Sequence, residues 1–507
     1  MKRRLVAVPD NTDMRWTRRR VLSTFGAALP LLALNACAVP LPAVLARPTP
    51  ASVSLPLVIA EAYCRDTVQG GSHITLLDDS VRRWVAAAEA ALQGRVLLPL
   101  QVVPFQSEGV DTYATTAAVN AGTSQPLWFA THDVLWRLRA LGVLADLRAH
   151  VKQDHALGNG RLHPDALATM HWAGTQVGLP VALWPALLAI DARVPPPPAG
   201  WSWADAAKIP SASGWPVQLL PEMPPLATWL WPQGADLFSA DNARPTITDP
   251  AALTGLAAYA NAFGPSGQGK LSPLPGGGLR PEDNGTTDSN TWIKRTLALR
   301  AQQVQQRTVQ AWFPPDEWPP ATPGPHRWQD SVGPLRRMPV PGAAQGALPV
   351  IAYGVGIRSD AAQPDLAYGA ARTLQDAAPA FLAYAPFIAE QTASALQRRW
   401  SALTTDQATE LAAALTLRLR PTWSVPYGVL LQQPFLGWSA DITQPQRWDG
   451  GHLMGAGIPR SPQALLHVTL ALCQVLALNL LPVPAAAGNA AHAIQAILAA
   501  WAVQPHA

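Results

Sequence analysis

The sequence predicts an α/β protein of two or more lobes, and three observations support this. First, about 471 of the 507 residues remain once an N-terminal export-type segment is set aside, which is too many for one core. Second, 49% of the residues are hydrophobic, so a large area can be buried. Third, short strand-like apolar runs alternate with amphipathic helical patterns, as in α/β folds.

The N-terminal segment has the organisation of an export signal. Three arginines, Arg18 to Arg20, precede a short apolar run that ends at Cys37. The run is too short for a confident membrane-spanning helix. The arginines resemble a twin-arginine export motif, and Leu34-Asn35-Ala36-Cys37 resembles a bacterial lipobox, where cleavage precedes a lipid-modified cysteine. We predict a signal peptide at 1–36; the alternative is an uncleaved N-terminal anchor.

The formal charge of +4 belongs mainly to this signal. Residues 1–36 hold seven Lys and Arg against two Asp, so the remaining chain is near −1. The basic pI of the whole chain therefore indicates no nucleic-acid partner.

The chain after the signal begins with a proline-rich stretch. Five prolines and no helical period at 38–56 predict a semi-extended tether. A strand at Leu57–Ala60, a helix at Val81–Gln93 and a strand at Leu100–Val103 should follow. Further on, Thr404 and Gln407 fit a capping box, and Ser461-Pro462 fits a helix start. Polar residues interrupt the apolar helix after Ser461 within the length of one membrane span, so we expect it to be buried in protein.

Motifs for catalysis are absent from the sequence. It contains no nucleophile elbow, no H-E-x-x-H, no phosphate loop and no dinucleotide fingerprint. We therefore predict no catalytic residues, no metal and no cofactor, although a glycosidase carboxylate pair would be invisible in sequence. Besides Cys37, only Cys64 and Cys473 are present, and we expect free thiols, with a bridge between them as the alternative.

Tryptophan is abundant, with 20 residues against 7 Tyr and 9 Phe. Most should be core residues, because large aromatic side chains bury much area. A minority could line a site. A cleft rich in Trp with a few carboxylates suits a carbohydrate, because the rings cover its C–H face and the carboxylates accept from its hydroxyls.

Several motifs in order resemble one family. The segment QPLWFATHDVLWRLRALGVLADL at 125–147, with its G-x-L-x-D-L turn, is similar to the family 1 extracellular solute-binding proteins of ABC importers, the maltose-binding-protein-like family. The strand at 174–191 resembles the family's G-L-P crossover, and Trp201 to Asp205 resembles a helix start. Further similar segments, in order, are 234–250, 299–306 and 354–364.

The resemblance covers most of 57–375 and fades beyond about 380. Some motif positions differ from the family pattern, namely Leu127, Ile190-Asp191, Gln302 and Gln305-Gln306. These departures concern the identity of the ligand more than the fold.

The resemblance implies a two-lobed periplasmic-binding-protein-like fold of type II, in which each lobe is a mixed β-sheet flanked by helices and a hinge joins them. Ligand would bind between the lobes and drive closure. The predicted organisation is a signal at 1–36, lipidated Cys37 and tether at 37–56, lobe 1 at 57–182, lobe 2 at 183–352, a return to lobe 1 at 353–425, and a mainly helical 426–507 completing lobe 2.

Candidate ligand contacts follow from the matched motifs. Asp133 with His132 lies where a family carboxylate contacts sugar, although an Asp capping the following helix is the alternative. Trp128, by contrast, should be buried in a strand. The other candidates are Trp184, Glu222, Trp229, Trp312, Glu61 and Tyr63.

The predicted function is that of a lipid-anchored binding protein on the extracytoplasmic face of the membrane, not an enzyme. Its partners would be a small molecule, expected to be a carbohydrate, and ABC permease subunits, and we expect a monomer. Two alternatives remain: a lipid-anchored enzyme such as a glycosidase, and a scaffold lipoprotein that has lost its ligand.

Overall fold

The structure is a computed structural model that divides into two units, Met1–Pro50 and Ala51–Ala507. Only the second contains described residues. These are 52–60, 79–103, 126–157, 160–185, 187–191, 196–206, 217–218, 226–239, 243–263, 271–272, 311–312, 335–382, 386–399, 403–421, 464–477, 479 and 481–502.

The first of two larger sheets has six strands around the fully buried strand β14 (Leu348–Ile357). Strand β14 runs antiparallel to both of its long neighbours, β5 (Leu127–Thr131) and β8 (Leu179–Pro185). The central strands consist of apolar residues, as expected of a sheet covered on both faces. The remaining strands are β2 (Leu57–Ala60), β4 (Leu100–Val103) and β15 (Leu419–Pro421), all in parallel pairs.

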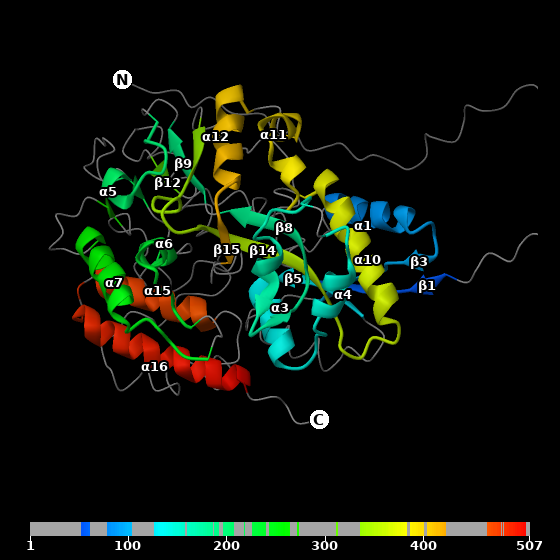
Figure 1. Ribbon diagram of the computed structural model, residues 1–507, viewed down its shortest axis with the longest axis horizontal. Helices are drawn as coiled ribbons and strands as arrows, with labels where there is room; N and C mark the ends of the chain where they lie inside the picture. Colours follow the sequence, from blue (N-terminus) through cyan, green and yellow to red (C-terminus); the bar gives the residue numbers. More distant parts are fainter. Residues whose placement is uncertain are drawn as a thin grey trace, which may run out of the picture. The chain divides into compact units, whose positions relative to one another are not determined.

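Helices pack on this first sheet. Helix α10 (Pro364–Ala377) contacts β8, β14 and α1 (Asp79–Ala91), and α3 (His132–Ala140) contacts β5 and β14 (Figure 1). The Trp84 indole of α1 donates to the carbonyl of Leu374 in α10 at 2.8 Å, which fixes the two helices to each other. Smaller elements nearby are β1 (Val53–Ser54), β3 (Val96–Leu97), α4 (Arg148–Gln153), η2 (Leu167–Met170), β6 (His171–Trp172), β7 (Thr175–Gln176) and η7 (Ala378–Ala380).

The second sheet has five strands in the order β11-β10-β12-β9-β13. Its longest pairing is antiparallel, between β9 (Leu187–Asp191) and β13 (Leu335–Pro339). The three short strands are β10 (Val217–Gln218), β11 (Leu271–Ser272) and β12 (Ala311–Trp312). Associated helices are α5 (Trp203–Ala206), α6 (Leu226–Leu230), η3 (Trp231–Gln233), α7 (Pro250–Phe263), η8 (Ile388–Gln391), α11 (Ala393–Arg399) and α12 (Thr405–Leu415).

The chain passes between the two sheets more than once. Strand β8 in the first sheet ends at Pro185, and β9 in the second begins at Leu187. Strand β13 then leads back to β14. This arrangement agrees with the predicted two-lobed α/β architecture, in which strands link the lobes.

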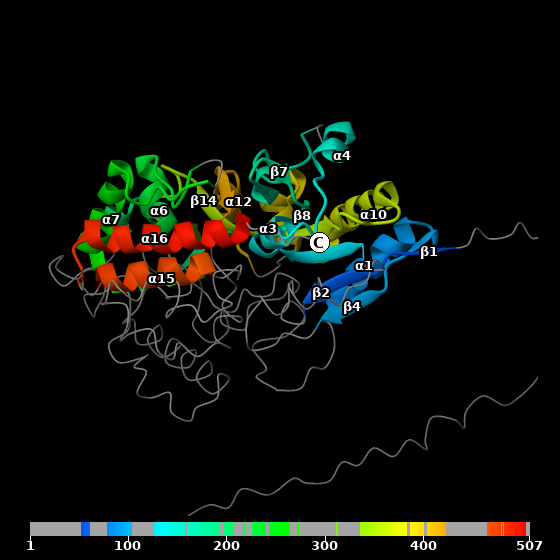
Figure 2. The same cartoon turned by 90° about the horizontal axis from the view of Figure 1, so that it is seen from below.

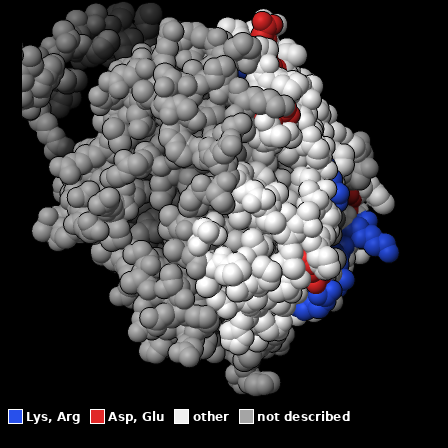
Figure 3. Space-filling view, turned by 90° about the vertical axis from the view of Figure 1, so that its left-hand side faces the viewer, with Lys and Arg blue, Asp and Glu red and all other residues white. Residues whose placement is uncertain are grey.

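The last two helices, α15 (Ala464–Ala477) and α16 (Val483–Ala502), run side by side and both contact α7 (Figures 1 and 2). None of the three contains Asp, Glu, Lys or Arg. Figure 3, seen from the side where α7 lies in Figure 1, shows a largely uncharged described surface. Apolar packing therefore holds this layer together, and Cys473 lies inside it as a free thiol whose pKa burial raises to about 12.

Most of the predicted elements form as expected. The strands at 57–60 and 100–103 are β2 and β4, the helix predicted at 81–93 is α1, and Trp128 is a buried strand residue. The Thr404–Gln407 capping box is complete in both directions. One boundary differs: inside the stretch predicted as tether, Val53–Ser54 pairs with Val96–Leu97 as a separate two-stranded parallel sheet, and the next apolar residue, Leu55, is buried. Ser461-Pro462 lies outside the described residues.

Candidate functional site

The candidate site starts where β5 ends and α3 begins. Thr131 closes the strand in extended conformation and precedes the helix that starts at His132. Thr131, His132 and Asp133 are all buried, with exposed fractions of 2%, 0% and 4%. A strand leading directly into a helix thus places polar side chains beside the centre of the first sheet.

His132 terminates the pairing of β5 with β14. The last residue pair of that ladder is Thr131 with Tyr353, so the next amide of β14, on Ala352, has no strand partner on this side. The Ala352 N–H donates instead to His132 Nδ1 at 3.2 Å. The same Nδ1 lies 3.4 Å from the Ala352 carbonyl oxygen, so its role as donor or acceptor depends on the tautomer. Both contacts are with the backbone of β14 and give His132 a structural role.

Asp133 is a buried carboxylate whose hydrogen bonding is incomplete. Its Oδ1 has no hydrogen-bond partner among the described residues. Burial is the largest influence on the side chain and raises its pKa above the ordinary value of 3.8, against the effects of His132, the Thr131 side chain and the Val134 amide. An unmet buried acceptor is costly in a free protein. It is also the group that a ligand hydroxyl would satisfy.

The alternative for Asp133, a helix cap, fits the structure only in part. The N-cap residue of α3 is Thr131, and its side chain makes no capping hydrogen bond. Asp133 lies one position into the helix, where the helix dipole favours its charged form. The first turn of α3 therefore lowers the free-energy cost of burying this carboxylate, but it leaves Oδ1 without a partner among the described residues.

An aromatic series extends from this point. The His132 ring meets Trp136 edge-on at 4.6 Å, Trp136 stacks on Trp172 at 5.0 Å, and Trp172 meets Phe238 edge-on at 6.0 Å. Trp136, Trp172 and Phe238 are not among the ligand contacts predicted from the sequence. Trp136 lies one helical turn after His132, and this spacing is the feature of the sequence that could have indicated their contact.

The other candidates fall in different places. Trp184 lies in β8 opposite Ile351, next to the residue that bonds His132, so its backbone lies beside the same stretch of β14. Trp312 belongs to the second sheet, opposite Gln218 and Ala189. For both, the backbone position alone is described.

Trp229 belongs to an aromatic cluster of the second sheet's helices. Its ring is half-buried and stacks on Trp203 at 5.2 Å, with Tyr259 edge-on at 5.8 Å. The described contacts of this ring are therefore with two other aromatic side chains. Glu61, Tyr63, Glu222, Cys37 and Cys64 lie outside the described residues.

Among the described residues, no group of three or more His, Cys, Asp or Glu side chains could hold a metal ion. Of the helices in that part of the chain, none combines the length and the apolar character needed to cross a membrane.

No protein-family model and no curated protein matches the sequence. Solved structures, in contrast, match over nearly the whole chain. An ABC substrate-binding protein from Listeria monocytogenes, in complex with cycloalternan, is similar at a TM-score of 0.55 and 15% identity, covering 88% of this chain and 98% of its own.

Two further structures are similar to the same extent. The sugar-binding protein MalE from Xanthomonas citri matches at a TM-score of 0.54 and 13% identity, covering 88% of this chain and 98% of its own. The cyclic α-maltosyl-1,6-maltose binding protein from Arthrobacter globiformis matches at 0.53 and 14%, covering 88% and 99%. The chain therefore has the two-lobed α/β fold of MalE-like binding proteins, and the fold prediction is confirmed.

Proposed function

We propose that the protein is a solute-binding protein that captures a sugar or oligosaccharide between two lobes and delivers it to an ABC importer. The observation that carries the proposal is the likeness to sugar-binding proteins, which extends over 88% of the chain and 98% or more of theirs. The buried, incompletely bonded Asp133 supports it, because a binding site keeps polar groups that only the ligand satisfies.

The lobes in this proposal follow the predicted division. Lobe 1 would comprise 57–182 and 353–425, and lobe 2 would comprise 183–352 and 426–507. Three elements depart from these bounds, because all of β8 and β14 belongs to the first sheet and α12 contacts β13 of the second. Ligand that touches both lobes would bind the closed form preferentially and shift the population toward it.

The proposed contacts combine polar and aromatic groups. Asp133 would accept hydrogen bonds from ligand hydroxyls, and His132 would contact a hydroxyl through Nε2. The aromatic wall would come from tryptophans of both sheets, and the remaining polar contacts from loops after the strands. The full proposed set is Asp133, His132, Trp184, Glu222, Trp229, Trp312, Glu61 and Tyr63.

A panel of mono- and oligosaccharides, screened by shift of the melting temperature, tests the proposal. Ligand that binds only the folded protein stabilises it by about 2.7 kcal/mol at a hundred times its Kd, so one or more sugars should raise the melting temperature. If no sugar does so and polyols or peptides do, the carbohydrate assignment is wrong. Cleavage of a binding oligosaccharide would favour the glycosidase alternative, and the absence of any ligand would favour the scaffold.

We also propose that lipid on Cys37 anchors the protein outside the cytoplasm. The Cys37→Ala variant should move from the membrane to the soluble extracytoplasmic fraction, because the lipobox cysteine is the proposed attachment point. Fractionation followed by immunoblotting measures this. A Cys64→Ala variant is the matched control and should stay in the membrane. Retention of the Cys37→Ala variant there would overturn the anchor.

A further inference from the structure

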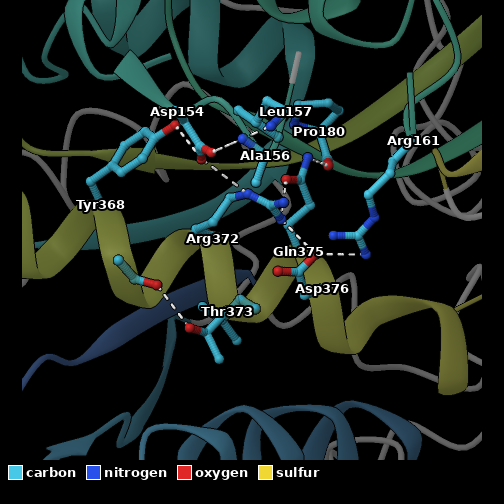
Figure 4. Close-up of polar contacts among 12 residues, drawn as sticks. Asp154, Ala156, Leu157, Arg161, Pro180, Tyr368, Arg372, Thr373, Gln375 and Asp376 are labelled. Carbon is cyan, nitrogen blue, oxygen red and sulfur yellow. Dashed lines mark hydrogen bonds and ion pairs between the residues drawn. The ribbon is translucent and has the colours of Figure 1, made fainter. Parts of the chain in front are cut away.

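A buried amide of α10 holds the strand that links the two sheets. Gln375 is fully buried, and its Nε2 donates to the carbonyl oxygen of Pro180 in β8 at 2.6 Å (Figure 4). The two residues lie 195 positions apart in the sequence. Helix α10 thus contacts the backbone of β8 directly, five residues before that strand ends at Pro185.

The Pro180 carbonyl belongs to an irregular part of β8. Pro180 pairs with Gly354 of β14, whereas Ala182 pairs with Tyr353, so Val181 is an extra residue in the ladder. Such a bulge disrupts the local hydrogen bonding and bends the strand. Gly354 is required there, because a Cβ on it would lie 2.8 Å from the Leu179 carbonyl oxygen. Gln375 supplies a donor at this irregularity.

The orientation of the Gln375 amide is fixed by Arg372. Arg372 Nη1 donates to Gln375 Oε1 at 3.0 Å. Since Oε1 accepts from the guanidinium, Nε2 must be the atom that faces Pro180, because only the amide nitrogen can donate. Arg372 thus donates to Gln375, and Gln375 in turn donates to the backbone of β8.

Arg372 is in turn held by two carboxylates. Its Nε lies 3.1 Å from Asp154 Oδ2, and its Nη1 lies 2.6 Å from Asp376 Oδ1. Asp154 also accepts from the Tyr368 hydroxyl at 3.2 Å and from the Ala156 amide at 3.0 Å. The Arg372 and Asp154 side chains are only 11% and 14% exposed. A mostly buried series of hydrogen bonds and ion pairs thus connects the loop after α4, through α10, to the bulge in β8.

We propose that Gln375, oriented by Arg372, is a positioning residue that sets the direction in which β8 leaves the first sheet, and thereby the balance between open and closed lobes. The proposal rests on the proposed function, because the balance matters through ligand affinity. A protein whose binding-competent form is partly populated has its affinity reduced by that fraction. Removing the hydrogen bond from Gln375 to Pro180 should change the fraction of molecules in the binding-competent form.

The test compares Gln375→Leu with Gln176→Leu in the full-length chain. Leucine removes the donor at similar volume. Gln176 is a matched control, because it is also buried and donates to a backbone carbonyl, that of Gly178, at 2.7 Å, outside the bulge. Spin labels on cysteines at the exposed positions Asp365 and Thr254, with Cys37 and Cys64 replaced by serine, report the distance between α10 and α7.

Gln375→Leu should shift this distance distribution and change the Kd for a sugar identified in the panel by about threefold or more. Gln176→Leu should lower stability without either effect. If Gln375→Leu does not fold, Arg372→Lys is used, since lysine keeps the charge without the planar fork, and it should shift the distance distribution relative to the wild type. An unchanged distribution in the folded variant overturns the inference. If no sugar binds any variant, the proposed function fails while the distances still decide the inference.

Discussion

Replacing Asp133 with asparagine is expected to stabilise the unliganded protein and to weaken its affinity for sugar. Asp133 is 4% exposed, and its Oδ1 has no hydrogen-bond partner among the described residues. A buried polar group left unsatisfied costs about 1 to 3 kcal/mol. The amide keeps the shape and removes the charge, so unfolding at pH 7 should require about 1 kcal/mol more. Loss of a charge-assisted hydrogen bond should weaken binding about tenfold.

The stability difference should depend on pH. The pKa of Asp133 is raised in the folded protein, so folding favours its protonated form, and the cost of the charged form appears as pH rises through the raised value. The free energy of unfolding of the variant should exceed that of the wild type most at neutral pH. The difference should shrink as pH falls toward 3.8, the ordinary pKa of this carboxyl. Urea unfolding at several pH values measures both proteins.

Asp154→Asn is the matched control for this substitution. Asp154 is also mostly buried, but it pairs with Arg372 at 3.1 Å and accepts from Tyr368, so its charge is compensated. Asparagine there should lower stability, because Arg372 loses a charged partner in a buried setting. If both variants are destabilised alike, Asp133 is a structural helix-terminal residue. If Asp133→Asn binds sugar as the wild type does, the carboxylate does not contact the ligand.

Much of the fold could be predicted from local sequence patterns. Short apolar runs such as Leu57–Ala60 form buried strands, and the T-x-x-Q signal at Thr404 forms a complete capping box. These features depend on neighbours within a few residues, so sequence reveals them. The pairing of Val53 with Val96 was missed, because a strand of two residues gives almost no pattern.

Less of the candidate site than of the fold could be predicted from the sequence. The position of Asp133 was predicted from a family motif, but the aromatic series from Trp136 to Phe238 joins segments far apart in the chain. The contact of Gln375 with Pro180 likewise spans 195 positions. Such convergence depends on the packing of sheets and helices, which one sequence does not display. The stacking of Trp229 on Trp203, from another helix, is a further contact of this kind.

Tryptophan substitutions should therefore divide into two classes, and Trp312 and Trp203 are expected to represent them. Trp312→Ala should weaken sugar binding by more than about tenfold, or roughly 1.4 kcal/mol, with little change in the melting temperature of the unliganded protein. The reason is that an aromatic wall contributes contact area to the C–H face of a sugar. Titration with an identified sugar, followed by tryptophan fluorescence, measures the affinity.

Trp203→Ala should have the opposite effect. The Trp203 side chain is buried, stacks on Trp229 at 5.2 Å, and donates from Nε1 to the Thr228 hydroxyl at 3.0 Å. Truncating such a residue leaves a cavity and removes one hydrogen bond of the Thr228 hydroxyl, so unfolding should cost about 3 to 5 kcal/mol less, while the folded fraction keeps its affinity. A large stability loss in Trp312→Ala with unchanged affinity would place Trp312 in the core and remove it from the proposed site. Weakened binding in a stably folded Trp203→Ala variant would instead show that the cluster around Trp229 supports the ligand.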